Sequence, residues 1–299
     1  MTTEQLATRT RGMVVFAPTP FCDAAGCTRV DEDGVRRNLD HLIAGGMPAV
    51  VVCGGVGELW DLSETEHLQV ARAAATHANG RIAVYAGVYG NAAESAARAR
   101  QLEAVGADGV LLFPDDDAVP NGPALLEYYR TVSQAIGIGM MPFRADAWVD
   151  VPLLQRLADV PGVVALKEER ENMDEFRQIV LGVGDRMAII GAGDPLAPCY
   201  LVLGAAGVAC SLSNLVPGLY DQMWTASQHW DYRRVMEIHT SLGALNEIRR
   251  RNGTSALKAG LELLGLAGGP CRAGRPRLDP ADAEPLRRAL LDLGAPLAG

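Results

Sequence analysis

A lysine ends a short apolar run in the segment GVVALKEERE (162–171), and its amine is the group best suited to chemistry in this sequence. The chain has 27 Lys and Arg residues, but only Lys167 and Lys258 are lysines. Because arginine supplies nearly all other positive charge, a lysine at the end of a buried strand needs an explanation specific to an amine. Lys258, in TSALKAGLE, has the pattern of a lysine on the outer face of a helix, so we expect no catalytic role for it.

An amine that is partly removed from water can act as a nucleophile. Desolvation disfavours the charged ammonium and lowers its pKa, which leaves more free amine to attack a carbonyl and form a Schiff base. The alternative is that Lys167 extends to solvent and pairs with Glu168 or Glu169. The scarcity of lysine favours the chemical role.

The segments that must position Lys167 are short apolar runs that alternate with amphipathic helical stretches. The helices begin near potential N-cap residues, such as Ser63 with Glu66 and Asn91 with Glu94. Strands that are apolar almost throughout are typical of a parallel sheet covered on both faces. We therefore predict an α/β fold, a (β/α)8 TIM barrel, over an open doubly wound sheet, whose first-turn GxGxxG is missing. The predicted strands cover 12–18, 49–55, 82–88, 109–114, 137–143, 163–169, 187–193 and 207–212.

The chain is predicted to form a single domain, 1–299, with the barrel over 12–225 and a C-terminal helical extension over 226–299. In such barrels the active site lies at the C-terminal ends of the strands, and Lys167 lies at this end of the sixth predicted strand. Alternation along a strand places Lys167 and Glu169 on one face and Glu168 on the other.

Composition and charge argue against several classes of partner and cofactor. A net charge of −9 argues against nucleic acid or an anionic membrane as a partner. Without a signal-peptide pattern or an apolar run of bilayer length, we expect a cytoplasmic protein. The six cysteines form no CxxC pair, and the five histidines lie in helical segments. We therefore expect no metal and no cofactor.

Five segments resemble the dihydrodipicolinate synthase/N-acetylneuraminate lyase family of class I aldolases. The resemblance runs in order over nearly the whole chain, and GGVGE and PFRADA are most similar to the 5-dehydro-4-deoxyglucarate dehydratase branch. The segments are FAPTPF (16–21), GGVGELWDLSETE (54–66), VVALKE (163–168), GAGD (191–194) and SALKAGLELLGLAGGPCR (255–272).

This resemblance implies a barrel, a homo-oligomer (a tetramer or a dimer), and a Schiff base between Lys167 and a small-molecule 2-oxo acid. It also implies that the turn at Gly55 and Val56 binds the substrate's carboxylate through backbone amides. A glycine turn exposes such amides, and converging N–H groups attract anions.

The sequence departs from the family at the residues that usually carry hydroxyl groups. Val56 stands where the family has a threonine. Pro142, or Met141 with a shifted register, aligns with the tyrosine that ends the fifth strand, so Pro142 is an expected substrate contact. Asp115 replaces a third hydroxyl, a tyrosine after the fourth strand. The resemblance therefore predicts that the usual proton relay is absent.

Glu169 is the best candidate to replace this relay. It lies about 6–7 Å along the strand from Lys167, within reach of a bound substrate, and could act as a general acid and base. Tyr89 and the acidic run 115–117 are further candidates. Arg144 could bind a distal carboxylate of the substrate with its planar guanidinium, or form a surface salt bridge instead.

Three functions are compatible with this pattern. We favour a Schiff-base lyase, of aldolase or dehydratase type, that acts on a 2-oxo acid through Lys167. The first alternative is a specialised biosynthetic enzyme that uses the same lysine on another carbonyl compound. The second is a non-catalytic homologue that binds a small acid, although a pure binder has no need for a buried amine.

Overall fold

Eight parallel strands close into a barrel in the computed structural model, which describes residues 1–24, 27–115, 121–146, 148–272, 274 and 277–298. Each strand pairs with its neighbours in chain order, and β1 closes the barrel by pairing with β10. The predicted (β/α)8 barrel is therefore confirmed. The strands are β1 (Gly12–Phe16), β4 (Ala49–Val52), β5 (Ala83–Gly90), β6 (Gly109–Pro114), β7 (Gly139–Arg144), β8 (Ala165–Glu168), β9 (Ala188–Ala192) and β10 (Gly207–Cys210).

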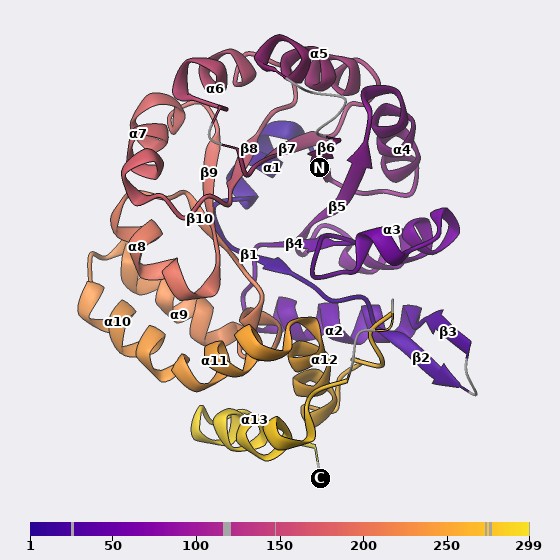
Figure 1. Cartoon of the computed structure of the whole chain (residues 1–299), viewed down its shortest axis with the longest axis vertical. Coiled ribbons are helices and arrows are strands. Elements are labelled where there is room, and N and C mark those ends of the chain that lie inside the picture. Colours follow the sequence, from indigo (N-terminus) through magenta and orange to yellow (C-terminus); the bar gives the residue numbers. More distant parts are fainter. Residues whose placement is uncertain (25–26, 116–120, 147, 273, 275–276, 299) are drawn as a thin grey trace.

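A ring of helices surrounds the barrel (Figure 1). Two of them begin at capping boxes, in which Ser63 pairs with Glu66 and Asn91 with Glu94, as the sequence predicts. The helices that follow the eight barrel strands are α2 (Glu32–Ala44), α3 (Glu64–Ala78), α4 (Ala92–Ala104), α5 (Gly122–Ser133), α6 (Val151–Leu157), α7 (Met173–Val183), α8 (Ala197–Val202) and α9 (Pro217–Gln228), with short 3-10 turns η1 (Leu59–Asp61), η3 (Asp194–Leu196) and η4 (Leu212–Asn214).

Two N-terminal features were not predicted. A hairpin of β2 (Phe21–Ala24) and β3 (Cys27–Val30) follows β1. Helix α1 (Thr3–Arg9) precedes β1, and its Leu6 is fully buried in the cluster that fills the barrel. Leu6 packs beside Gly139, where β7 begins, so α1 covers the N-terminal ends of the strands. A ligand must therefore enter from the opposite end.

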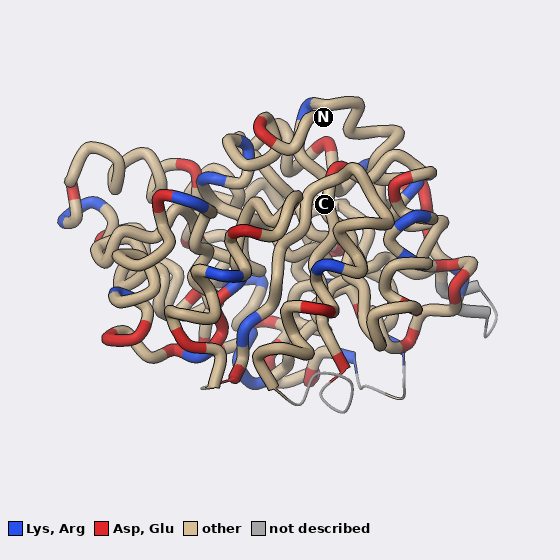
Figure 2. Tube along the Cα trace, turned by 90° about the horizontal axis from the view of Figure 1, so that it is seen from above, with Lys and Arg blue, Asp and Glu red and all other residues tan. Residues whose placement is uncertain are grey.

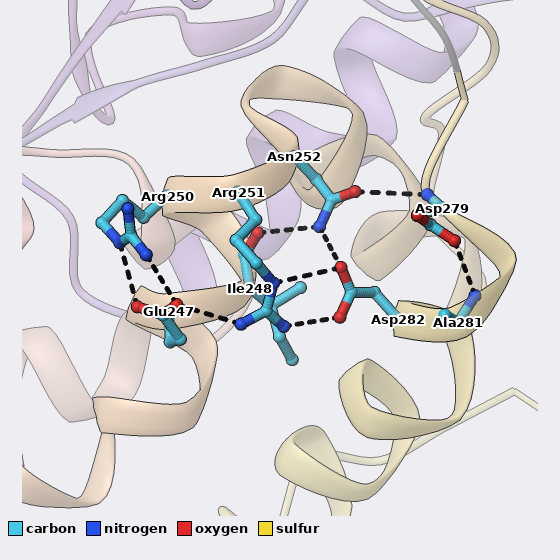
Figure 3. Close-up of polar contacts among 8 residues, drawn as sticks. All are labelled: Glu247, Ile248, Arg250, Arg251, Asn252, Asp279, Ala281 and Asp282. Carbon is cyan, nitrogen blue, oxygen red and sulfur yellow. Dashed lines mark hydrogen bonds and ion pairs between the residues drawn. The ribbon is translucent and has the colours of Figure 1, made fainter.

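The C-terminal part of the chain is helical, as predicted, and lies along one side of the barrel (Figure 1). Figure 3 shows how its helices are joined: Arg251 and Asn252 both bind the carboxylate of Asp282, at 2.5 Å and 2.6 Å. The predicted boundary after residue 225 falls inside α9, and the domain division stays a prediction. These helices are α10 (Tyr232–Ser241), α11 (Gly243–Asn252), α12 (Thr254–Leu263) and α13 (Pro280–Asp292).

Lys258 does not lie on a solvent face, so that prediction was wrong. Its side chain is 2% exposed, and its Nζ lies 2.6 Å from Oε1 of the fully buried Glu58. Nζ also donates to the Pro270 carbonyl at 2.7 Å, and the Arg272 amide donates to the other Glu58 oxygen at 2.7 Å. The C-terminal tail is thus fixed to residues 54–58, the GGVGE turn that follows β4.

The charged residues are mixed rather than segregated. Figure 2 shows acidic and basic positions interspersed along the trace in this view. Among the described residues, no helix is both long and apolar enough to span a bilayer. The expected cytoplasmic location stays a prediction.

The buried pair makes a testable contribution to stability. Lys258→Met leaves the Glu58 carboxylate buried without its cation, so the free energy of unfolding should fall by about 3–5 kcal/mol in urea titrations. Adding Glu58→Gln should recover part of this loss, because no unpaired charge then remains. As a control, Arg233→Met removes one partner of an exposed pair with Glu237 and should have a much smaller effect. Equal losses in the two single variants would contradict the importance of the buried pair.

Candidate active site

Lys167 lies at the C-terminal end of β8 and points into the barrel. Its side chain is 10% exposed, and its Nζ lies 4.9 Å and 4.8 Å from the ring centroids of Phe16 and Phe143. Burial lowers the pKa of Lys167, and the nearby Glu169 carboxylate opposes this effect without cancelling it. The site therefore holds an amine that gives up its proton more readily than an exposed lysine does.

Glu169 is the ion-pair partner of Lys167. Its amide donates to the Arg144 carbonyl at 2.9 Å, which fixes the backbone just past β8. Its side chain is 45% exposed, so the carboxylate contacts both the buried amine and the solvent. Both residues line one cavity, whereas Glu168 points to the other side of the strand, as strand alternation predicts.

The cavity around Lys167 has a volume of about 250 Å³. Charged and polar side chains share its lining with apolar ones, and sites for small molecules likewise combine apolar walls with polar groups that fix the ligand. Its walls come from the ends of several strands and from α11, and the lining includes Phe16, Val56, Lys167, Glu169, Asp194 and Arg249.

The GGVGE turn brings Val56 to this cavity, with Gly55 beside it in sequence. The turn is closed by the Glu58 amide, which donates to the Gly55 carbonyl, and by the Leu59 amide, which donates to the Gly54 carbonyl. Within the described part of the chain, the amides of Gly55 and Val56 donate to no protein acceptor. Such free amides are able to bind an anion.

We expected Pro142 to contact the substrate, but it does not lie beside Lys167. On β7, Met141 and Phe143 belong to the interior of the barrel, so the intervening Pro142 faces outward. Phe143 is the register partner of Lys167, and its ring packs against the amine. An aromatic ring without a hydroxyl therefore takes the place at the lysine that we expected Pro142 to occupy.

Arg144 likewise lies away from the cavity. Its guanidinium forms a buried ion pair with Glu168 at 2.7 Å, a second contact with Glu175 at 3.2 Å, and a hydrogen bond to the Val149 carbonyl at 2.6 Å. With these donors occupied outside the barrel, Arg144 is not available to bind a substrate carboxylate. The salt-bridge alternative describes this residue better, although the pair is buried rather than on the surface.

The other proton-transfer candidates line a second cavity of about 410 Å³. Tyr89, Asp115 and Asp146 contribute its polar groups, and Phe143 lies in its wall. Neither Tyr89 nor Asp115 lines the cavity around Lys167. Asp116 and Asp117 lie outside the described residues. Glu169 is thus the predicted acid or base that the structure brings to the amine.

Asp194, to which we had assigned no role beyond its place in GAGD, is buried in the wall of the first cavity. Its carboxylate accepts hydrogen bonds from the amide and hydroxyl of Ser211 at 2.9 Å and 2.8 Å, from the Leu212 amide at 3.2 Å, and from the Tyr220 hydroxyl at 2.5 Å. These bonds join the segments after β9 and β10. Its position in GAGD was the signal that could have identified it.

Arg249 is the second wall residue that sequence reasoning missed. It comes from α11, in the run NEIRRRN, and lines the cavity together with Lys167. Burial lowers the pKa of Arg249, and the nearby Asp194 opposes this effect. Three consecutive arginines at the end of a helix suggest a solvated basic face, and nothing in the run shows that Arg249 and its neighbour Arg250 both line the cavity.

The described residues contain no group of three or more His, Cys, Asp or Glu side chains arranged to hold a metal ion.

Comparison with known proteins relates this geometry to one family. A relative from Methanospirillum hungatei, described as a 4-hydroxy-tetrahydrodipicolinate synthase, is 32% identical over 85% of this chain and 89% of its own length. A Bacillus subtilis protein described as a probable 5-dehydro-4-deoxyglucarate dehydratase is 28% identical over 85% of this chain and 84% of its own. Since relatives of both kinds match, placement with the dehydratase branch stays a prediction.

Solved structures agree with this relationship. The crystal structure of dihydrodipicolinate synthase from Aquifex aeolicus superimposes with a TM-score of 0.88 at 28% identity, covering 97% of this chain and 100% of that chain. The model of the dihydrodipicolinate synthetase family matches residues 9–289. The chain therefore belongs to the dihydrodipicolinate synthetase family, whose members are lyases of the aldolase and dehydratase type.

Proposed function

We propose that this protein is a Schiff-base lyase that acts on a 2-oxo acid through Lys167. The observation that carries the proposal is a buried amine of lowered pKa at the C-terminal end of a barrel strand, facing a cavity of small-molecule size. Active sites of TIM-barrel enzymes lie at this end. Family membership supports the same chemistry.

The free amine would attack the carbonyl carbon of the 2-oxo acid. Loss of the carbonyl oxygen as water gives an imine, and protonation of the imine nitrogen lets it accept the electron pair released at the neighbouring carbon. That pair is released when a proton leaves this carbon or when its bond to the next carbon breaks. The same imine therefore serves an aldolase or a dehydratase.

Glu169 would move the protons in these steps. As a carboxylate paired with Lys167, it can take the ammonium proton and so generate the nucleophile. The protonated carboxyl can then assist the departure of water, and the regenerated carboxylate can accept the proton from the carbon next to the imine. This assignment would replace the family's hydroxyl relay.

The free amides of the GGVGE turn would bind the carboxylate next to the reacting carbonyl. Val56 lies in the wall of the cavity, and neither its amide nor that of Gly55 has an acceptor within the described part of the chain.

We also expect a homo-oligomer, a dimer or a tetramer. Three half-exposed aromatic side chains, Trp60, Tyr89 and Trp148, line the second cavity, and a neighbouring subunit could cover them. The mass of the protein in solution would measure the oligomeric state.

Borohydride trapping tests the proposed function directly. Incubation with pyruvate or a longer 2-oxo acid, followed by reduction, should add one substrate to the chain, at the peptide that contains Lys167. Because Lys258 is buried in its pair with Glu58, it should stay unlabelled. Lys167→Met, as the matched control, should abolish the adduct. Labelling at Lys258, or no adduct with any acid tried, would refute the proposal.

The role of Glu169 is tested by hydrogen exchange at the carbon next to the imine. In deuterated water, NMR should show that Glu169→Gln exchanges the C3 hydrogens of a bound 2-oxo acid about 10²–10⁴-fold more slowly than the wild type, while borohydride still traps the imine. Tyr89→Phe should exchange at nearly the wild-type rate. The opposite pattern in these two variants would assign proton transfer to the second cavity.

A further inference from the structure

We propose that Arg249 binds a second anionic group of the substrate, so that the cavity selects 2-oxo acids with a carboxylate or phosphate at the far end. This inference rests on the proposed function, because it concerns the substrate that Lys167 would hold. It also moves the binding of a distal anion from Arg144, which is occupied elsewhere, to the C-terminal extension.

The placement of Arg249 is the first argument. Arg249 and Asn246 lie three residues apart on α11, hence on the same face of the helix, and both line the cavity that contains Lys167. The Nε atom of Arg249 is buried and has no hydrogen-bond partner among the described residues. Buried polar groups are normally paired, and a donor left unpaired is costly.

The neighbouring arginines show why Arg249 differs from them. Arg250 donates two hydrogen bonds to Glu247, at 3.0 Å and 2.8 Å, and Arg251 binds both Glu247 and Asp282 (Figure 3). Of the three consecutive arginines, only Arg249 has no ion pair with a carboxylate within the described part of the chain.

The nearby acidic residue in the wall, Asp194, attracts Arg249 but forms no ion pair with it within the described part of the chain. The carboxylate of Asp194 is occupied by Ser211, Leu212 and Tyr220, which hold it in the loop structure. Lys167 is already paired with Glu169. The guanidinium of Arg249 is thus the cation of the cavity that remains to be matched, and a planar fork of N–H donors suits a carboxylate or a phosphate.

Under the proposed function, Arg249 would bind the far end of the substrate. The carboxylate beside the reacting carbonyl has the GGVGE turn after β4 as its proposed partner, whereas Arg249 comes from α11. A monoanionic 2-oxo acid would leave the guanidinium unmatched. A substrate with anionic groups at both ends would use the turn, Lys167 and Arg249 together.

Trapping of matched acids tests the inference. We would compare the concentrations that give half-maximal borohydride trapping of Lys167 for 2-oxoglutarate, 2-oxo-4-phosphonobutanoate and 2-oxopentanoate, which has the same length as 2-oxoglutarate but no distal charge. The wild type should favour at least one of the dianionic acids over 2-oxopentanoate by about 10–100-fold, the usual size of a charged hydrogen bond. The better of the two identifies the distal group as a carboxylate or a phosphate.

Arg249→Met should remove this preference and leave the trapping of 2-oxopentanoate unchanged. Arg250→Met removes the same charge from the next residue, which also lines the cavity, and should keep most of the preference, because Arg250 is already paired with Glu247. Equal loss in both variants, or no preference in the wild type, would overturn the role of Arg249 while the proposed function stood. No trapping of any acid would refute the proposed function and this inference with it.

Discussion

The desolvation of one amine is the constraint on which the rest of the site depends. Lys167 is held between two aromatic rings at the mouth of the barrel, where a charged ammonium is poorly solvated. The half-exposed carboxylate of Glu169, two residues along the chain, partly offsets the cost of burying this charge. A fully exposed lysine would rarely lose its proton, and a lysine with a fully buried partner would have no carboxylate that reaches solvent. The geometry of β8 thus places the amine between these two limits and gives it a local group that can take its proton.

The chain's other lysine shows what a fully buried partner does. Lys258 and Glu58 are both almost completely enclosed, and their pair ties α12 and the tail to the GGVGE turn. This pair suits a structural role, because neither charge has access to solvent. Through this pair the C-terminal extension is held against the barrel, and the bonds between α11 and α13 hold the extension itself together. The extension in this way supplies one wall of the cavity, with Arg249 in it.

The sequence allowed the barrel, its strands and several helix starts to be predicted, because they depend on local patterns: continuous apolar runs, and capping residues at fixed spacing. Strand alternation likewise allowed us to predict that Lys167 and Glu169 lie on the same face of their strand. The predictions were wrong where the surroundings of a side chain depend on contacts with residues distant in the sequence. The burial of Lys258 depends on Glu58, 200 residues earlier, and the enclosure of Arg144 depends on Glu168 and Glu175. Phe143 replaced Pro142 at the lysine because an alignment by motif does not fix which strand residue faces inward. Arg249 could not be told from its two neighbours, since only the packing of α11 decides that Arg249 and Arg250 line the cavity and that Arg250 pairs with Glu247.

The pH dependence of reductive alkylation at Lys167 tests the central claim most directly. Only the free amine reacts, so the labelling rate at a fixed 2-oxo acid concentration falls as the pH drops through the pKa of Lys167. The account predicts a pKa below the ordinary value of about 10.4, because burial outweighs the attraction of Glu169. It predicts a still lower pKa in Glu169→Gln, because the opposing carboxylate is then neutral. A pKa at or above the ordinary value, or an increase in the glutamine variant, would contradict a desolvated amine controlled by Glu169.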